Sequence, residues 1–284
     1  MVVKFLYPRW GAAHVPWSVF LDQAVAAGYA GVEWFPYGEQ ATVETILSQV
    51  QELKAREMTY TLVMTVVGEW DDFEGYCTLL TQQLIELCLL TRAYKPRFIS
   101  AQVGREYFTN NQIIDCLELC NRIAQEQGIE ILQETHRNKW SYGLHRVVEV
   151  LESYAEVSFT LDLSHWFCIS ESYLEDRVEQ VCKILAKTKH IHARIGSTQS
   201  AQVHDVRLEQ FEPAVKAHWA FWKRWLELMK AKGEEEVTIT TEFGPPPYSL
   251  ALLNQDRDYA FQWEQNSWIK NYLNEEINKI YDIA

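Results

Sequence analysis

Residues 129–165 read IEILQETHRNKWSYGLHRVVEVLESYAEVSFTLDLSH, and this stretch decides the fold of the chain. A short β-rich run at 129–134, with Ile129, Ile131 and Leu132, is followed by an amphipathic stretch at 143–154, and a second β-rich run begins at residue 157. Buried strands read as short apolar runs, whereas helices place apolar residues three and four positions apart. The stretch therefore predicts a strand, a helix and a second strand parallel to the first.

The same alternation runs along the whole chain of 284 residues. Strands are predicted at 2–7, 31–35, 59–66, 97–103, 129–134, 157–163, 190–195 and 237–242. Helices are predicted at 16–27, 43–56, 73–91, 111–127, 143–154, 173–187, 209–232 and 259–280. Eight such units in this length favour one α/β domain over residues 1–284, a single (β/α)₈ TIM barrel with outer helices. A doubly wound sheet is the alternative, but residues 8–11 form no glycine-rich phosphate loop after the first strand.

The composition restricts the partners. The chain carries 26 Lys and Arg against 39 Asp and Glu, so its formal net charge is −13. Nucleic acids and anionic membranes attract basic surfaces, and no apolar run approaches the roughly 20 residues that a membrane span needs. Residues 1–10 lead directly into a strand, with no signal-peptide core. We therefore expect a cytoplasmic protein without nucleic-acid or membrane partners, whose six cysteines are free thiols.

Polar residues end four successive strands of the predicted barrel. Glu134 ends the fifth strand, Asp162 lies at the end of the sixth, His192 lies in the seventh and Glu242 ends the eighth. Active sites of these barrels lie at the carboxyl ends of the strands. Buried charges are costly unless they are paired or bind a metal. Three carboxylates and an imidazole suit one divalent ion, such as Mn²⁺, Mg²⁺, Co²⁺ or Zn²⁺.

The sequence resembles the xylose-isomerase-like TIM-barrel superfamily, the sugar phosphate isomerase/epimerase family, which also contains inosose dehydratases and AP-endonuclease-type barrels. The motifs that carry the resemblance are Gly28-Tyr29-Ala30-Gly31-Val32-Glu33, Glu134, Asp162-Leu163-Ser164-His165, His190-Ile191-His192 and Glu242-Phe243-Gly244. The resemblance implies that Glu134, Asp162, His192 and Glu242 hold one metal ion. It also implies that Glu134 and Glu242 transfer protons and that His165 binds substrate.

We therefore expect a divalent-metal-dependent isomerase or epimerase of a small sugar or hydroxy-ketone, in which a proton moves through a metal-bound enediolate. We also expect substrate contacts from His136, Arg137, Arg194 and Trp10. An inosose-type dehydratase, which begins with the same proton abstraction, is one alternative. A metal-free sugar-binding barrel is another. Family members often form homo-oligomers, and we expect the same to be possible here.

Five arginines follow predicted strands: Arg9, Arg105, Arg137, Arg194 and Arg207. They either bind a carboxylate or phosphate group of a ligand or neutralise the acidic residues around them. The loop at 199–207 is longer than a typical connection of this fold, so we expect it to act as a lid.

Overall fold

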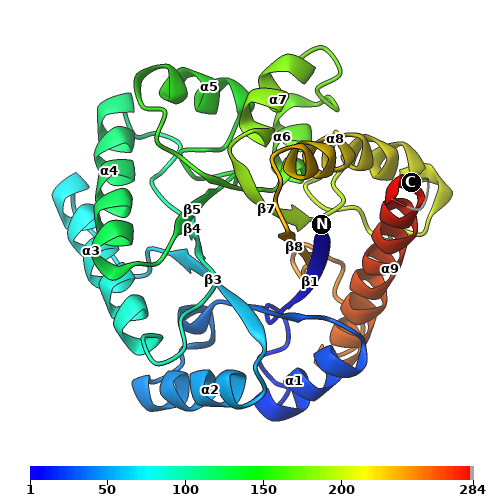
Figure 1. Cartoon of the computed structure of the whole chain (residues 1–284), viewed down its shortest axis with the longest axis horizontal. Coiled ribbons are helices and arrows are strands. Elements are labelled where there is room, and N and C mark those ends of the chain that lie inside the picture. Colours follow the sequence, from blue (N-terminus) through cyan, green and yellow to red (C-terminus); the bar gives the residue numbers. More distant parts are fainter. Residues whose placement is uncertain (282–284) are drawn as a thin grey trace.

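The computed structural model describes residues 1–281 and shows a closed barrel of parallel strands inside a ring of helices (Figure 1). The strands are β1 (Val2–Pro8), β2 (Gly31–Trp34), β3 (Thr59–Thr65), β4 (Ile99–Gln102), β5 (Ile131–Glu134), β6 (Phe159–Leu161), β7 (Thr188–Ala193) and β8 (Glu236–Thr241). Each strand pairs with the next one along the chain, and β8 closes the barrel on β1. The predicted α/β TIM-barrel fold is confirmed.

The helices follow the strands in the expected order. They are α1 (Trp17–Ala26), α2 (Val43–Ala55), α3 (Phe73–Leu90), α4 (Asn110–Gln127), α5 (Leu144–Ser153), α6 (Leu163–Ser170), α7 (Val178–Leu185), α8 (Glu212–Ala231) and α9 (Gln255–Tyr281), with short 3₁₀ turns at Pro36–Glu39 and Glu209–Phe211. Local sequence sets several of their starts. At α4, for example, the Thr109 side chain accepts a hydrogen bond from the Gln112 amide, and Gln112 bonds back to the Thr109 amide. Such a reciprocal cap satisfies backbone donors that the first helical turn leaves free.

The prediction was wrong where β6 ends. Residues 162–163 were assigned to the strand and 173–187 to one helix, whereas the structure ends β6 at Leu161 and begins α6 at Leu163. The reason is that Asp162 caps this helix, since its Oδ1 accepts a hydrogen bond 2.8 Å long from the Ser164 amide. The helix predicted at 173–187 is α7, which is shorter and spans Val178–Leu185.

The interior of the barrel is lined partly by small polar side chains. On β8, Thr238 and Thr240 alternate with the apolar Val237 and Ile239, and both threonines contact the ring of His190. Period-2 alternation sends the apolar set to the helices and the threonines inward. Small inward residues leave room for larger charged side chains higher in the barrel.

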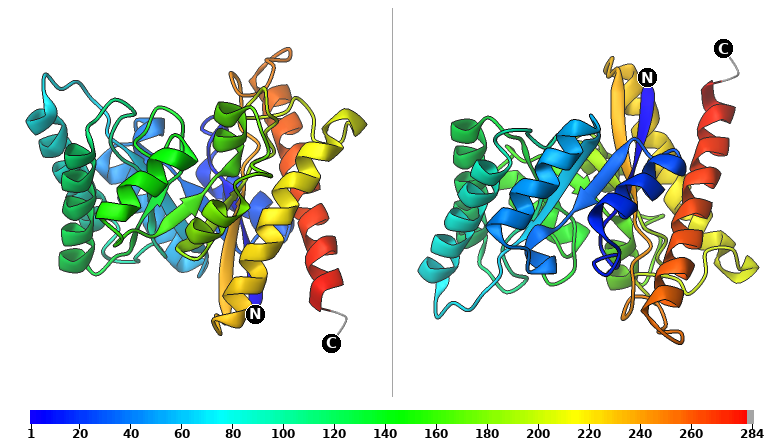
Figure 2. Two further views of the ribbon diagram at one scale, coloured as in Figure 1. Left: turned by 90° about the horizontal axis from the view of Figure 1, so that it is seen from above. Right: turned by 90° about the horizontal axis from the view of Figure 1, so that it is seen from below.

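The two ends of the barrel differ in what they carry. In both views of Figure 2, β1 begins and α9 ends at one end of the molecule, whereas the segment that follows β8 lies at the opposite end. The carboxyl ends of the strands, and the loops after them, therefore share that opposite end.

All six cysteines are free thiols. None of the helices within residues 1–281 is long and apolar enough to cross a membrane.

Candidate metal centre

Three of the predicted metal ligands meet inside the carboxyl end of the barrel. Glu134 is the last residue of β5, His192 lies in β7 and Glu242 follows β8, and all three are buried. His192 Nδ1 lies 2.9 Å from Glu242 Oε2 and 3.7 Å from Glu134 Oε1. These spacings suit neighbouring ligands of one ion with metal–ligand bonds of about 2.0–2.2 Å.

Each of these residues keeps one polar atom without a hydrogen-bond partner. Glu134 Oε1 accepts a bond of 3.0 Å from the Gln102 amide, but Glu134 Oε2 has no partner. Glu242 Oε1 lies 2.6 Å from the guanidinium of Arg194, but Oε2 has no hydrogen bond. His192 Nδ1 has no hydrogen bond either, although it forms an ion pair of 2.9 Å with Glu242 Oε2, and His192 Nε2 is bonded. Buried polar atoms without hydrogen bonds are costly, and a cation held by these three residues would offset that cost. The residues therefore fit a divalent ion.

Asp162, the fourth predicted ligand, has no such spare atom. Its Oδ1 caps α6, and its Oδ2 lies 3.0 Å from Arg194 Nε and 3.5 Å from His165 Nε2. The structure thus brings Glu134, His192 and Glu242 together, and places Asp162 beside them as the partner of an arginine.

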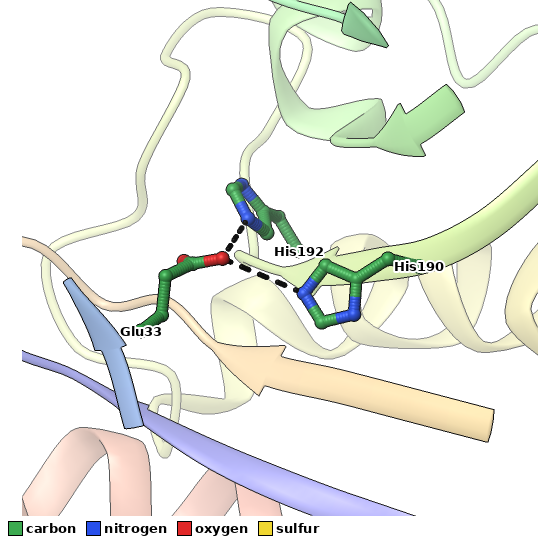
Figure 3. Close-up of side chains that lie close together, drawn as sticks. All are labelled: Glu33, His190 and His192. Carbon is green, nitrogen blue, oxygen red and sulfur yellow. Dashed lines mark hydrogen bonds and ion pairs between the residues drawn. The ribbon is translucent and has the colours of Figure 1, made fainter. Parts of the chain in front are cut away.

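Glu33 and His190 adjoin this centre, although the sequence analysis gave neither of them a role in the site (Figure 3). Glu33 Oε2, from β2, lies 3.0 Å from His192 Nε2 and 3.6 Å from His190 Nε2. Burial opposes ionisation of Glu33, but the two histidines hold its pKa well below the usual value. A carboxylate inside an apolar strand is rare unless it is paired, and this signal could have identified Glu33.

The hydrogen bonds separate the roles of the two histidines. His190 Nδ1 lies 2.7 Å from Thr238 Oγ1 and Nε2 lies 3.0 Å from Thr240 Oγ1, so both ring nitrogens are engaged. His192 instead directs Nε2 at Glu33 and leaves Nδ1 toward the glutamates. A carboxylate behind a histidine in this way sets the orientation of a metal ligand. In the metal-free chain burial disfavours the imidazolium, yet Glu242, Glu33 and Glu134 raise the pKa of His192 well above its usual value.

Two further histidines lie on the β5–β6 side. His165 is fully buried with no hydrogen bond to either nitrogen, and its ring lies 4.1 Å from that of His136. Burial and the positive charge of Arg194 lower the pKa of His165 well below the usual value. Burial and His165 lower the pKa of His136 to about 3. Both rings are therefore neutral near pH 7 and can exchange hydrogen bonds with a ligand.

Tyr248 joins the remaining predicted substrate residues. The guanidinium carbon of Arg194 lies 4.6 Å from the Tyr248 ring centre, and that of Arg137 lies 4.7 Å from it. Trp10 meets Tyr248 edge to face at 5.1 Å, and its indole lies so close to Gly244 that a Cβ there would be 2.3 Å from the ring. Tyr248 lies in the loop after β8, and no sequence pattern marked it.

These side chains border a cavity of about 300 Å³, large enough for a small molecule. The residues that line it are Pro8, Trp10, Glu33, Trp34, Phe35, Val63, Thr65, Gln102, His136, Arg194, Glu242 and Tyr248. Aromatic faces and a few charged groups thus surround one opening of the barrel.

The loop expected to be a lid is packed onto the site. Gln202 is buried, and its amide group bonds to both the N–H and the carbonyl of Gly244, at 2.7 and 3.1 Å. Gln202 Oε1 also accepts a bond of 3.1 Å from Arg194. The loop therefore supports Arg194 and the segment after β8.

Known proteins resemble this chain in fold and not in sequence. No model of a protein family matches the chain. No curated protein matches it either. Solved structures do, at low sequence identity. A xylose isomerase-like TIM barrel protein from Mycobacterium smegmatis, in complex with magnesium, is 12% identical with a TM-score of 0.60, and the match covers 94% of this chain and 97% of that one.

Two other matches are named as enzymes. D-psicose 3-epimerase with D-tagatose, from Clostridium cellulolyticum, is 10% identical with a TM-score of 0.62, covering 96% of this chain and 98% of that one. The probable 3-DHS dehydratase AsbF from Bacillus anthracis is 17% identical with a TM-score of 0.57, covering 92% and 97%. The chain therefore has the fold of the xylose-isomerase-like TIM-barrel proteins.

Proposed function

We propose that the chain is a divalent-metal-dependent isomerase or epimerase of a small sugar or hydroxy-ketone. One observation carries the proposal: Glu134, His192 and Glu242 are buried together, with one ligand atom of each within 4.8 Å of the others, and each keeps a polar atom without a hydrogen bond. Oxygen and nitrogen donors of this kind suit Mn²⁺, Mg²⁺, Co²⁺ or Zn²⁺. The magnesium in the M. smegmatis barrel supports a metal in this fold.

The metal would be held by Glu134, His192 and Glu242, with Glu33 behind the imidazole. A divalent ion at this point supplies Lewis acidity, which polarises the oxygens of an adjoining carbonyl and hydroxyl group and acidifies the C–H bond between them.

Glu134 and Glu242 are the residues that take and return the proton. They reach the site from β5 and from the end of β8, on different sides of the barrel. Without a metal, burial raises the pKa of Glu242, although Arg194 and His192 oppose that rise. Proton transfer by a positioned carboxyl group contributes about 10²–10⁴-fold to a reaction rate.

The other predicted residues bind the substrate and orient it. His165 is neutral and neither of its ring nitrogens has a hydrogen bond, so it can donate one to a substrate oxygen. His136 and Arg194 line the cavity, and Arg137 reaches it over Tyr248. The exposed indole of Trp10 offers a flat face to the C–H groups of a sugar ring.

The first test is the metal content of the purified chain, measured by elemental mass spectrometry. We expect a stoichiometric divalent ion that is lost in Glu134→Gln. Glu130→Gln is the matched control, since Glu130 is an exposed carboxylate on the segment before β5 that pairs with Lys189. If neither the chain as isolated nor the chain incubated with Mn²⁺ or Co²⁺ holds metal, the proposal is refuted, and a metal-free sugar-binding barrel takes its place.

The second test distinguishes the reactions. The metal-loaded chain is incubated with ketoses and inososes, and the products are examined by mass spectrometry and NMR. Isomerisation or epimerisation leaves the mass unchanged and alters the NMR spectrum. Loss of water would favour the dehydratase alternative. The probable 3-DHS dehydratase AsbF, whose fold this chain shares, supports that alternative.

A further inference from the structure

The structure sorts the five arginines that follow strands into two groups. Arg9 pairs with Glu39, Arg194 with Asp162 and Glu242, and Arg207 with Asp205 and Glu264. These three neutralise nearby carboxylates. Arg105 and Arg137 have no carboxylate within 4.0 Å among residues 1–281. Arg137 lies over Tyr248 among the substrate contacts proposed above. Arg105 instead lies in the loop after β4, beside Trp70.

Lys139, in the loop after β5, is a third cation that the structure leaves without a carboxylate within 4.0 Å among residues 1–281. Its side chain is buried, with 8% of the residue exposed, and its amine donates a bond of 2.6 Å to Thr65 Oγ1. Thr65 lines the cavity, so the Lys139 amine lies directly behind the cavity wall and not in the lining itself. An ammonium group taken out of water is costly unless an anion compensates it. Glu134 and Glu106 attract this amine, but neither comes within ion-pair distance in the part of the chain that the structure describes.

Arg105 and Lys139 are brought together by two loops in contact. The Trp140 amide donates a bond of 3.4 Å to the Val103 carbonyl. Gly104, with φ of +63°, packs so closely that a Cβ there would lie 3.3 Å from the Cβ of Trp140. Arg105 and Lys139 flank this contact. Burial and the positive charge of Arg105 lower the pKa of Lys139 to about 8.

The guanidinium of Arg105 is held but not neutralised. Its carbon lies 5.9 Å from the ring centre of Trp70, and its Nε is buried without a hydrogen-bond partner. Two neighbouring cations that repel each other, each with unused hydrogen-bonding capacity, are the arrangement that binds an oxyanion.

We propose that Lys139 and Arg105 bind an anionic group of the substrate, a carboxylate or a phosphate, at the β3–β5 side of the cavity. The inference rests on the proposed function in one respect, which is that the substrate occupies this cavity. It narrows the substrate class from neutral sugars to sugar acids or sugar phosphates.

The test uses metal-free protein and measures binding of inorganic phosphate by isothermal titration calorimetry. We expect phosphate to bind the parent chain and to bind Lys139→Gln and Arg105→Gln at least about tenfold more weakly, because each variant loses a hydrogen bond to a charged group. Lys223→Gln is the matched control, since Lys223 is an exposed cation on α8, and it should leave binding unchanged. A parent chain that binds no oxyanion, or variants that bind as tightly as the parent, would overturn the inference.

A parallel titration with D-glucuronate and D-glucose distinguishes the source of the charge. Tighter binding of glucuronate than of phosphate assigns the subsite to a carboxylate, and the reverse assigns it to a phosphate. If glucuronate and glucose bind equally well and phosphate does not bind, the result counts against a carboxylate subsite and a phosphate subsite alike. Because these titrations use metal-free protein, they fail independently of the metal-content test. Loss of binding in Lys139→Gln with normal metal content would confirm the subsite alone.

Discussion

Replacing Arg194 by methionine tests how the charges of the site are balanced. The guanidinium bridges Asp162 and Glu242, at 3.0 and 2.6 Å, and all three residues are buried. Methionine keeps much of the apolar stem and removes the charge. Removing one partner from a buried ion pair costs about 3–5 kcal/mol, because the other charge stays buried without compensation. With an unfolding entropy of about 2.1 cal/mol/K per residue, we expect the melting temperature of the metal-free chain to fall by roughly 5–8 °C.

A divalent ion should recover more stability in this variant than in the parent. In the parent, Arg194 occupies Asp162 Oδ2, so the proposed ion would be held by Glu134, His192 and Glu242. Without the guanidinium, that oxygen becomes a fourth ligand atom. The assay is thermal unfolding followed by circular dichroism, in chelator and in saturating Mn²⁺, since a ligand that binds only the folded state raises its stability.

The control is Arg97→Met, which removes an arginine that pairs with Glu236 at the surface, at the other end of the barrel. Surface pairs contribute about 0–1 kcal/mol, so this variant should melt close to the parent. Asp162→Asn combined with Arg194→Met should restore part of the loss, because it removes one of the two unpaired carboxylates. The reasoning is refuted if Arg194→Met and the parent have the same melting temperature in chelator, or if Mn²⁺ raises the melting temperature of both chains equally.

Three other predictions address single residues. Asp162→Asn in the presence of Arg194 should change Mn²⁺ affinity, measured by calorimetry, far less than Glu134→Gln, and equal losses would show that Asp162 is a ligand. Glu33→Gln should weaken Mn²⁺ affinity by about 10–100-fold, because His192 loses the carboxylate that orients its ring; an unchanged affinity would contradict this. Lys139→Met should raise stability at pH 7. In the folded chain the pKa of this amine is about 8, against an ordinary value of 10.5. The unfolded chain therefore binds more protons between these values, and stability of the parent should rise with pH through that window by at most about 3 kcal/mol. Denaturant unfolding at pH 7 and pH 10 measures this, and a destabilised Lys139→Met would indicate a packing role.

Sequence pattern predicted the elements well where one periodicity dominates. Residues 129–134 form a short β-rich run, and β5 ends at Glu134 as predicted. The segment after Asp162 was harder, since Leu163-Ser164-His165-Trp166-Phe167, the first part of α6, is buried and shows neither a polar face nor alternation. The hydrogen bond from Ser164 to Asp162 marks the start of this helix in the structure.

The sequence by itself determined the barrel and the set of polar residues at its carboxyl end. Strand periodicity and strand order are local properties, and parallel strands bring their carboxyl ends to one rim whatever their loops do. Only the tertiary structure decided which charges meet. Glu33 and His192 are 159 residues apart in the chain, and closure of the barrel brings them within 3.0 Å. The same closure pairs Arg194 with Asp162 and leaves Arg105 beside Lys139, because partners across a barrel depend on distances in space that no sequence spacing records.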